Sequence, residues 1–502
     1  MRATRREWIG LAVLALPCML YSMDLTVLNL AVPHLSADLQ PSSAQLLWIV
    51  DIYGFLLAGS LITMGTLGDR IGRRLLLLIG AAAFGVMSVV TAFASSVEML
   101  IGSRALLGVA ASTLAPSTLS LIRHMFVDPR QRTTAIAVWV ASFSAGAVIG
   151  PLLGGALLER YWWGSVFLLA VPVMVLLVIV GPVLLPEFRD PNAGRLDLIS
   201  AALSLAAVLL ITWGLKQIAQ DGVRWMPALS IAAGLAVGFV FVRRQLTMSS
   251  PLIDLRLFKS RAFSAALAIN TLDFFIGFGI ILFVAQYLQL VLGLSPLQAG
   301  LWMVPWAGGF IVGSMLTPLF ARWARPAFVM AAGLAFATIG FGLLTQIRAG
   351  SGLAVLVTGS VVFSLGLAPM TTLATDLMVS AAPPERAGAA AAISETSSEF
   401  GGALGIAVLG SLGTAVYRGQ MADKVMASVP LEAANAARST LGGAVAVAGH
   451  LPDQVGAALL SASRDAYALS FEITAAVSAV ITLVTAILAV ALLRHVRTHS
   501  DL

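Results

Sequence analysis

Residues 65–74 read GTLGDRIGRR, a short charged stretch between two long apolar runs at 46–68 and 75–95. An apolar run of about 20 residues is long enough to cross roughly 30 Å of hydrocarbon as a helix. Asp69 and Arg73 stand four residues apart, so they can pair on one helix face or reach the end of a neighbouring helix. The stretch therefore predicts a tight charged turn between two membrane helices.

The composition extends this interpretation to the whole chain. Of 502 residues, 59% are hydrophobic and 11% are charged, with a mean hydropathy of +0.94, whereas soluble proteins carry about 25% charged residues. The apolar runs are unbroken rather than alternating, which argues against a β-barrel. The single cysteine, Cys18, excludes an intramolecular disulfide and a Cys-based metal site. We expect an all-α integral membrane protein.

Fourteen apolar runs are long enough to span. They are 7–33, 46–68, 75–95, 98–122, 133–158, 163–186, 196–217, 225–243, 262–292, 297–321, 326–347, 352–380, 387–417 and 466–493. The linker 187–195 and the charged stretch 243–261 bracket one pair of helices. The predicted plan is a six-helix bundle at 1–186, an inserted helix pair with its linkers at 187–260, and a second six-helix bundle at 261–502.

The positions of the basic residues predict the orientation. With fourteen spans both termini lie on one side, and 21 of the 30 Lys and Arg residues fall on that side against eight on the other, Lys216 among the eight. The bias predicts cytosolic termini in a bacterial cytoplasmic membrane. The polar, Ala-rich segment 419–465 then forms an extracytoplasmic loop, as short amphipathic helices or a hairpin. Because the basic residues are scattered between apolar runs, nucleic-acid binding is not expected.

Two further stretches predict how helices contact one another. DPRQR at 128–132 supplies charged partners for the turn, so the predicted latch on the cytosolic side comprises Gly65, Asp69, Arg70, Gly72, Arg73 and Asp128. The alternative is an ordinary charged loop that only sets orientation. GAVIGPLLGG at 146–155 places Gly146, Gly150 and Gly154 at four-residue intervals, a stripe on which another helix packs closely. Pro151 removes one backbone hydrogen bond, which predicts a kinked helix.

These stretches resemble those of a known family. GTLGDRIGRR resembles the G-x-L-x-D-R-x-G-R-R signature of the major facilitator superfamily, and GAVIGPLLGG, which ends in Gly155, resembles its G-x-x-x-G-P-x-x-G-G antiporter motif. MDLTVLNLAVP at 23–33 and RALLG at 104–108 are similar to the first-helix and fourth-helix motifs of fourteen-helix drug:proton antiporters. The resemblance implies two six-helix bundles, alternating access, proton coupling, and export of lipophilic or quaternary ammonium cations.

Several acids lie inside the predicted spans, where a charge costs at least about 2.5–3.5 kcal/mol. Asp24 and Asp51 lie roughly 14 Å and 8 Å from the outer surface, and Arg104 enters from the same side. We expect Arg104 to be the charge partner of one of these acids. Either the pair is a static salt bridge that fixes helix packing, or the acid exchanges protons with a cationic drug.

The second half holds Asp273, Glu395 and Glu399. The two glutamates stand four residues apart on one helix face, where two negative charges repel, so we expect one to carry a proton while the other attracts a cation. The alternative is a polar face that touches water. Asp273 matches no motif.

Aromatic rings bind organic cations through their faces. The candidate drug contacts are Tyr21, Tyr53, Phe143, Phe274, Trp302 and Trp306. Most of them fit equally well as lipid-facing or interfacial residues, and Trp48, at a helix start, fits best as a membrane-belt residue.

Other functions are disfavoured by direct observation. None of the three lysines, Lys216, Lys259 and Lys424, follows a phosphate-binding glycine loop, and the five histidines fall in loops, at span ends or in the tail. No catalytic residue, metal or cofactor is therefore expected beyond the proton motive force. We expect a monomeric antiporter for organic cations; the alternative is a metabolite or nutrient transporter on the same fold.

Overall fold

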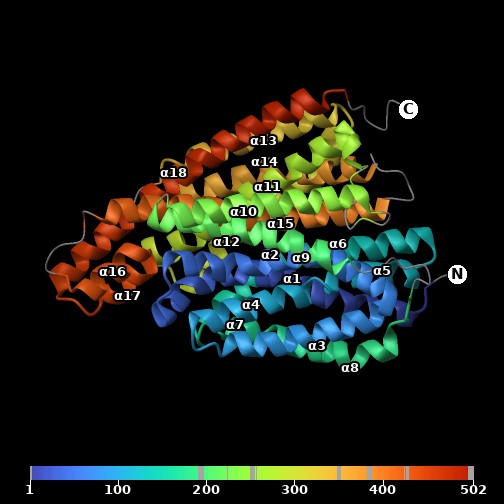
Figure 1. The fold of residues 1–502 in the computed structure, drawn as a ribbon, viewed down its shortest axis with the longest axis horizontal. Helices are drawn as coiled ribbons and strands as arrows, with labels where there is room; N and C mark the ends of the chain where they lie inside the picture. Colours follow the sequence, from blue (N-terminus) through green and yellow to red (C-terminus); the bar gives the residue numbers. More distant parts are fainter. Residues whose placement is uncertain are drawn as a thin grey trace.

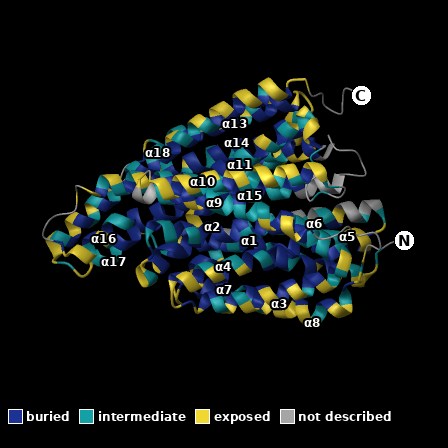
Figure 2. Cartoon of the chain, in the orientation of Figure 1, coloured by how far each residue is buried: buried dark blue, intermediate teal, exposed yellow. Residues whose placement is uncertain are grey.

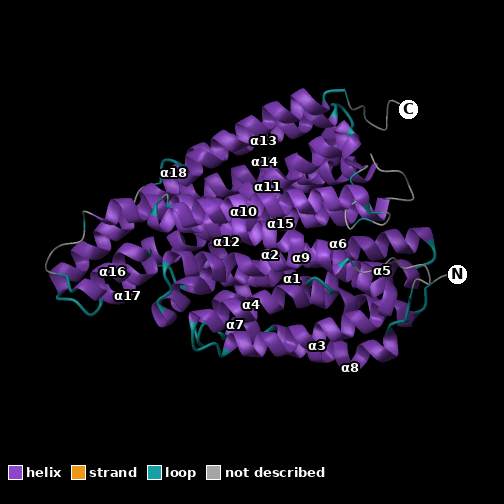
Figure 3. Cartoon of the chain, in the orientation of Figure 1, coloured by secondary structure: helices purple, strands orange, loops and turns teal. Residues whose placement is uncertain are grey.

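The structure is a computed structural model that describes residues 3–189, 197–222, 224–248, 251, 255, 257–347, 352–380, 387–422, 424 and 429–495. These residues form helices and loops without a strand (Figure 3). Among them, 14 helical segments are long and apolar enough to cross a membrane. The predicted all-α membrane fold with fourteen spans is confirmed.

The first eight helices form one group, called here the N-terminal bundle. They are α1 (Arg5–Leu39), α2 (Ser43–Ile71), α3 (Arg73–Ala92), α4 (Val97–Ala111), α5 (Leu114–Met125), α6 (Pro129–Leu158), α7 (Ser165–Leu168) and α8 (Ala170–Leu184). Two predicted spans, 98–122 and 163–186, are each broken into two helices. In the first, the hydroxyls of Ser112 and Thr113 donate to carbonyls three residues earlier, at Val109 and Ala110. Such side-chain bonds compete with the regular helix ladder.

The second group, called here the C-terminal bundle, holds the spanning helices that follow residue 260. They are α11 (Arg261–Gln286), continued by the π-helical turn η2 (Tyr287–Val291), α12 (Pro296–Ala321), α13 (Pro326–Leu344), α14 (Leu353–Ser380), α15 (Ala387–Ala422) and α18 (Asp453–Leu493). A short 3-10 turn, η1 (Leu257–Lys259), precedes them. The division of the chain into three domains stays a prediction.

The segment 419–465 forms short helices, which is one of the two forms predicted for it, but the last spanning helix begins earlier than predicted. It contains α16 (Leu431–Ser439) and α17 (Leu441–Ala448), and α18 begins at Asp453, well before the predicted start at 466. Residues 423 and 425–428 of this segment lie outside the described residues. The last helix is 41 residues long, more than an average bilayer requires, so its first turns extend out of the membrane toward α16 and α17.

The two ends of the molecule differ (Figure 1). The beginning of α1 and the end of α18 lie at one end, called here the termini end, and α16 and α17 protrude at the opposite end, called here the cap end. This arrangement agrees with an even number of spans.

The inserted pair, α9 (Leu198–Asp221) and α10 (Trp225–Thr247), lies across the middle of Figure 1. α9 packs against α2 of one bundle and α15 of the other. At the termini end of the pair, Arg244 lies 3.1 Å from Asp197, whose carboxylate also accepts from Ser200. Burial raises the pKa of Asp197, but the bonds from Ser200 and Arg244 outweigh burial and hold the pKa below its usual value. Residues 190–196 of the predicted linker lie outside the described residues.

The outer faces of the helices are apolar. Large side chains such as Ile179, Phe239 and Ile487 are exposed on α8, α10 and α18, and Figure 2 shows exposed residues along the outward sides of α3, α10 and α18. Continuous exposed apolar surface of this kind marks contact with lipid in a chain of this composition.

Candidate functional site

The buried arginine of α4 ties the first two helices together. The Arg104 guanidinium is 1% exposed; it lies 2.8 Å from Asp24 of α1 and donates to the Ile49 carbonyl of α2 at 3.1 Å. It also lies over the ring of Tyr53, 4.9 Å from its centre. The sequence left open whether Arg104 pairs with Asp24 or Asp51, and the structure places it on Asp24.

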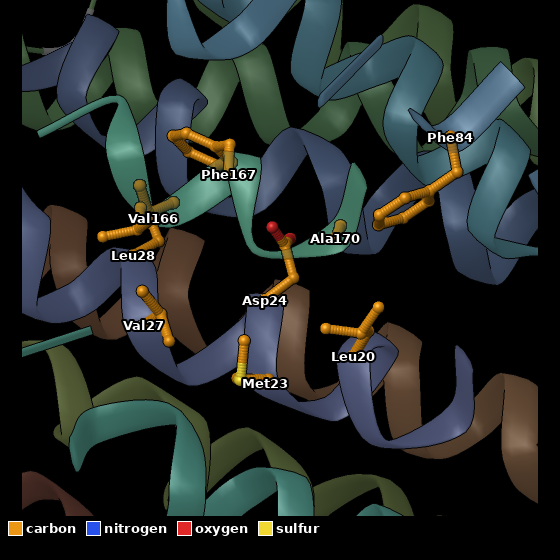
Figure 4. Close-up of a pocket in the computed structure, with 9 residues that line it drawn as sticks. All are labelled: Leu20, Met23, Asp24, Val27, Leu28, Phe84, Val166, Phe167 and Ala170. Atoms are coloured by element: carbon orange, nitrogen blue, oxygen red, sulfur yellow. The ribbon is translucent and has the colours of Figure 1, made fainter. Parts of the chain in front are cut away.

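Asp24 also lines a small cavity inside the N-terminal bundle. Figure 4 shows its carboxyl group directed toward Phe167 and Ala170, with Phe84 across the space. The cavity volume is about 10 Å³, roughly the space that one water molecule occupies. A drug-sized ligand needs a pocket of several hundred Å³, so this cavity does not hold cargo in the conformation described.

Asp51 of α2 pairs with a residue that the sequence analysis counted among the charges of the outer side. The Lys216 ammonium of α9 lies 2.8 Å from both Asp51 carboxylate oxygens, and both side chains are almost completely buried. It also lies 3.7 Å from the centre of the Trp48 ring. The predicted span 196–217 places Lys216 at its outer end, among the charges of the outer side, whereas the structure buries its ammonium against Asp51. Trp48, which was expected to be a membrane-belt residue, thus contacts the ammonium of Lys216.

Glu399 of α15 lies where the two bundles meet. The Tyr21 hydroxyl of α1 donates a hydrogen bond to its carboxylate, and no described Lys or Arg forms an ion pair with it. Together with Asp51, Phe274 and Phe278, Glu399 lines a cavity of about 20 Å³. One acid from each bundle therefore faces the same small space, beside two stacked aromatic rings.

Glu395 lies one turn from Glu399, toward the termini end of α15. It is partly exposed, and no described residue forms a hydrogen bond or ion pair with it. The expected pair of glutamates on one helix face is therefore present, with the inner one bonded to a hydroxyl.

Asp273 of α11 is 3% exposed inside the C-terminal bundle. The Thr371 hydroxyl donates to one of its oxygens, and the other oxygen has no hydrogen-bond partner among the described residues. One turn earlier, the Asn270 amide donates to the hydroxyls of Ser397 and Ser398 at 2.9 Å. Asp273 is thus a buried acid with a hydroxyl partner and no ion pair to a described basic residue.

The predicted aromatic contacts separate into two sets. Tyr21, Tyr53, Phe143 and Phe274 lie near the acids: Phe143 packs edge-on against Tyr21, 5.5 Å between ring centres, and Phe274 lines the Glu399 cavity. Trp302 is 43% exposed and Trp306 is partly buried against the core of α12 and its neighbours.

The charged turn at 65–74 is held by contacts that the sequence predicted in part. Arg73 donates to Asp69 at 2.7 Å and to the Pro116 carbonyl of α5 at 3.4 Å. Glu187, after α8, accepts from the backbone N–H of Arg74 and was missed by the sequence interpretation.

The other latch residues are placed as follows. Gly72 joins α2 to α3 with a φ of 120°, a conformation that strongly favours glycine. Gly65 lies near the Pro116 side chain, and Arg70 is exposed. The Asp128 carboxylate accepts from the Gln131 N–H at 3.0 Å, at the start of helix α6, and its role as a partner of the turn stays a prediction.

The glycine stripe of α6 faces α1. A Cβ on Gly146 would lie 2.1 Å from the Met19 carbonyl oxygen, one on Gly150 would meet Thr26, and one on Gly154 would meet Val27. The same helix then contacts the C-terminal bundle, where a Cβ on Gly155 would lie 2.6 Å from the Pro296 carbonyl oxygen. Pro151 lies within the helix, and the kink stays a prediction. The motif thus packs α6 tightly between the bundles.

Several bundle-to-bundle contacts lie toward the cap end. Ser295 donates to Glu159 at 2.6 Å, and Gln289 donates to the Leu30 carbonyl at 3.0 Å. Ser43 at the start of α2 donates to the carbonyl of Ser439, the last residue of α16. The Tyr21–Glu399 bond lies nearer the middle of the helices. Contacts concentrated at one end are the arrangement expected of one state in a rocking cycle.

We predict that Gly300→Ala weakens the closure at the cap end. A Cβ on Gly300 would lie 2.3 Å from the Pro151 carbonyl oxygen, a backbone atom that cannot move aside. Overpacking of this kind costs about 1–3 kcal/mol, enough to shift a two-state equilibrium about fivefold or more. Spin labels on cysteines replacing the exposed Val127 and Trp323 at the termini end, in a Cys18→Ala background, should gain a shorter distance component.

Gly308→Ala is the matched control on the same helix, because a Cβ there would meet no atom within 4 Å. It should leave the distance distribution unchanged. A Gly300→Ala distribution equal to that of Gly308→Ala would contradict the prediction.

Comparison with known proteins places these features in a family. Residues 14–406 match the model described as Major Facilitator Superfamily. The chain is 43% identical to the multidrug efflux pump LfrA of Mycolicibacterium smegmatis, covering 97% of this chain and 96% of that one. It is 36% identical to the methyl viologen resistance protein SmvA of Salmonella typhimurium, covering 93% and 94%.

A solved structure shares the fold. The bacterial homologue of the human lysosomal transporter Spinster, in an inward-facing and unoccupied conformation, superposes with a TM-score of 0.70 at 19% identity, covering 99% of both chains. At that identity the likeness concerns the fold alone.

Proposed function

The chain belongs to the Major Facilitator Superfamily, and we propose that it exports lipophilic and quaternary ammonium cations in exchange for protons. It is a multi-pass membrane transporter and not an enzyme. The names of its relatives, which describe multidrug efflux and methyl viologen resistance, support outward transport of drug-like cargo.

The observation that carries proton coupling is the environment of Glu399. Its carboxyl group lies at the junction of the bundles, bonded to the Tyr21 hydroxyl, with no ion pair to a described Lys or Arg. An ionised carboxylate without a cation is costly in such surroundings. Two states of Glu399 have low free energy: the protonated acid, and the carboxylate with a bound cation.

Exclusive occupancy of this carboxyl couples the two fluxes. A proton on Glu399 neutralises the cavity and lets the bundles close around it, as they do around the space of about 20 Å³. An entering cation displaces the proton and the Tyr21 hydroxyl, and it lies against the faces of Phe274 and Phe278. Because the site holds one or the other, each cation exported is exchanged for an entering proton.

The other candidate acids fall into two groups, those with a basic partner and those without one among the described residues. Glu395 and Asp273 also lack a basic partner among the described residues, so we assign proton transfer to the C-terminal bundle. Asp24 and Asp51 are held by Arg104 and Lys216. Asp24, the acid that the first-helix motif singles out, therefore acts through its ion pair, as a positioning residue, and not as the proton carrier.

The orientation follows from the charge bias of the loops. With cytosolic termini in a bacterial inner membrane, the contacts at the cap end close the outer side of the protein. The proton gradient supplies the energy, without a bound cofactor.

Inside-out membrane vesicles test the function. After an imposed acid interior is established, adding tetraphenylphosphonium should dissipate the pH gradient in vesicles that contain the protein, while vesicles without it hold the gradient. Unchanged gradients in both preparations would contradict proton-coupled cation export. Dissipation by a neutral metabolite alone would instead support a nutrient transporter on this fold.

A further inference from the structure

The inserted helix pair reaches the cavity through one side chain. α9 packs against α2 and α15, one helix from each bundle. Its apolar residues Val208 and Leu209 contact a small cluster of Phe55, Ala403 and Ala407 from those two helices. From this position Lys216 extends to Asp51, which lines the cavity of Glu399.

Lys216 is held as firmly as the acid that it neutralises. The Lys216 and Asp51 side chains are 1% and 0% exposed, and the Trp48 ring lies 3.7 Å from the ammonium. A lysine in hydrocarbon is costly, and a position close to a helix end usually lets its ammonium extend to the membrane surface. Here the ammonium turns inward and occupies a carboxylate of the candidate site.

The lysine therefore changes how many charges the cavity offers to cargo. Asp51 and Glu399 both line the space, but the Asp51 charge is already balanced by Lys216. One carboxylate, Glu399, remains for a bound cation. We propose that Lys216 is a specificity residue, a tethered cation that occupies Asp51 and so tunes the central cavity to monovalent organic cations. This inference rests on the proposed function and specifies its substrate class.

Removing the ammonium should add a second usable carboxylate. In Lys216→Met, Asp51 takes up a proton in the empty cavity and releases it when a second positive charge arrives. A divalent cation then gains an interaction that a monovalent cation cannot use. At the separations inside one cavity, that interaction is worth about tenfold in affinity or more.

Binding to the purified full-length protein tests this without a proton gradient. Dissociation constants are measured by calorimetry for tetraphenylphosphonium, which is monovalent, and for methyl viologen, which is divalent. We expect Lys216→Met to raise the affinity for the divalent probe relative to the monovalent probe by about tenfold. An unchanged ratio would overturn the proposal and leave Lys216 a purely structural contact.

A second ion pair of the same helix pair provides the control. Arg244 of α10 lies 3.1 Å from Asp197 and is not one of the residues that line the cavity. Arg244→Met should leave the ratio of affinities unchanged. A change equal to that of Lys216→Met would trace the effect to loosening of the inserted pair and overturn the proposal.

A third comparison tests the proposal if Lys216→Met fails to fold. Asp51→Asn leaves the lysine charge beside the cavity without its partner, and Asp51→Asn with Lys216→Met removes both charges. We expect the single variant to bind both probes about tenfold more weakly than the double variant. Equal binding would overturn the proposal.

A different result would show that the proposed function itself fails: the unaltered protein would then bind neither probe. Failure of the Lys216 proposal alone leaves binding by the unaltered protein intact.

Discussion

Glu399→Gln is expected to abolish cation-driven proton movement in vesicles. Glutamine keeps the size of the side chain and can accept the Tyr21 hydrogen bond, so the junction between the bundles stays packed. It cannot release a proton or carry a negative charge, and the proposed exchange requires both. Dissipation of an imposed pH gradient on addition of tetraphenylphosphonium is the measurement, and the rate should fall to that of vesicles without the protein.

Glu432→Gln is the matched control, because Glu432 lies exposed on α16, outside the predicted spans. It should transport at the unaltered rate. If Glu399→Gln retained full coupling at equal protein abundance, Glu399 would be removed from the mechanism and Glu395 and Asp273 would become the candidates.

Arg104→Met is expected to cause a large loss of stability. The guanidinium is 1% exposed and joins α1, α2 and α4 through Asp24 and the Ile49 carbonyl. Removing one partner of a buried ion pair typically costs about 3–5 kcal/mol, because the other charge is left without a partner. A lowered unfolding temperature of the purified protein would report the loss.

Asp24→Asn combined with Arg104→Met separates the ion pair from the packing. The double variant leaves no charge unpaired, so it should recover most of the lost stability. Equal unfolding temperatures for the single and double variants would show that the packing of the Arg104 stem, and not its charge, holds the three helices together.

The apolar runs predicted the spans well, because a helix that meets lipid must be apolar over the thickness of the bilayer. They could not locate the start of α18, since its first turns extend out of the membrane and carry Asp453, Arg464 and Asp465. A helix that lies outside the lipid has a polar sequence, and such a sequence cannot be told from that of a loop by its apolar residues.

The sequence identified candidate site residues, but it did not predict which of them pair with one another. Lys216 lies at the end of the predicted span 196–217, and counting it as a charge of the outer side agreed with the charge bias. Its contact with Asp51 depends on how α9 packs against α2, across 165 residues of sequence. The Tyr21–Glu399 bond joins residues 378 apart in different bundles. No local pattern carries that information.

Proton release on cation binding tests most directly whether one carboxyl group serves both ions. The purified protein is placed in a weakly buffered solution with a pH indicator, and tetraphenylphosphonium is added. The unaltered protein should release protons in proportion to the cation bound, and Glu399→Gln should release none. Cation binding without proton release from the unaltered protein, or equal release from both proteins, would contradict exclusive occupancy of Glu399.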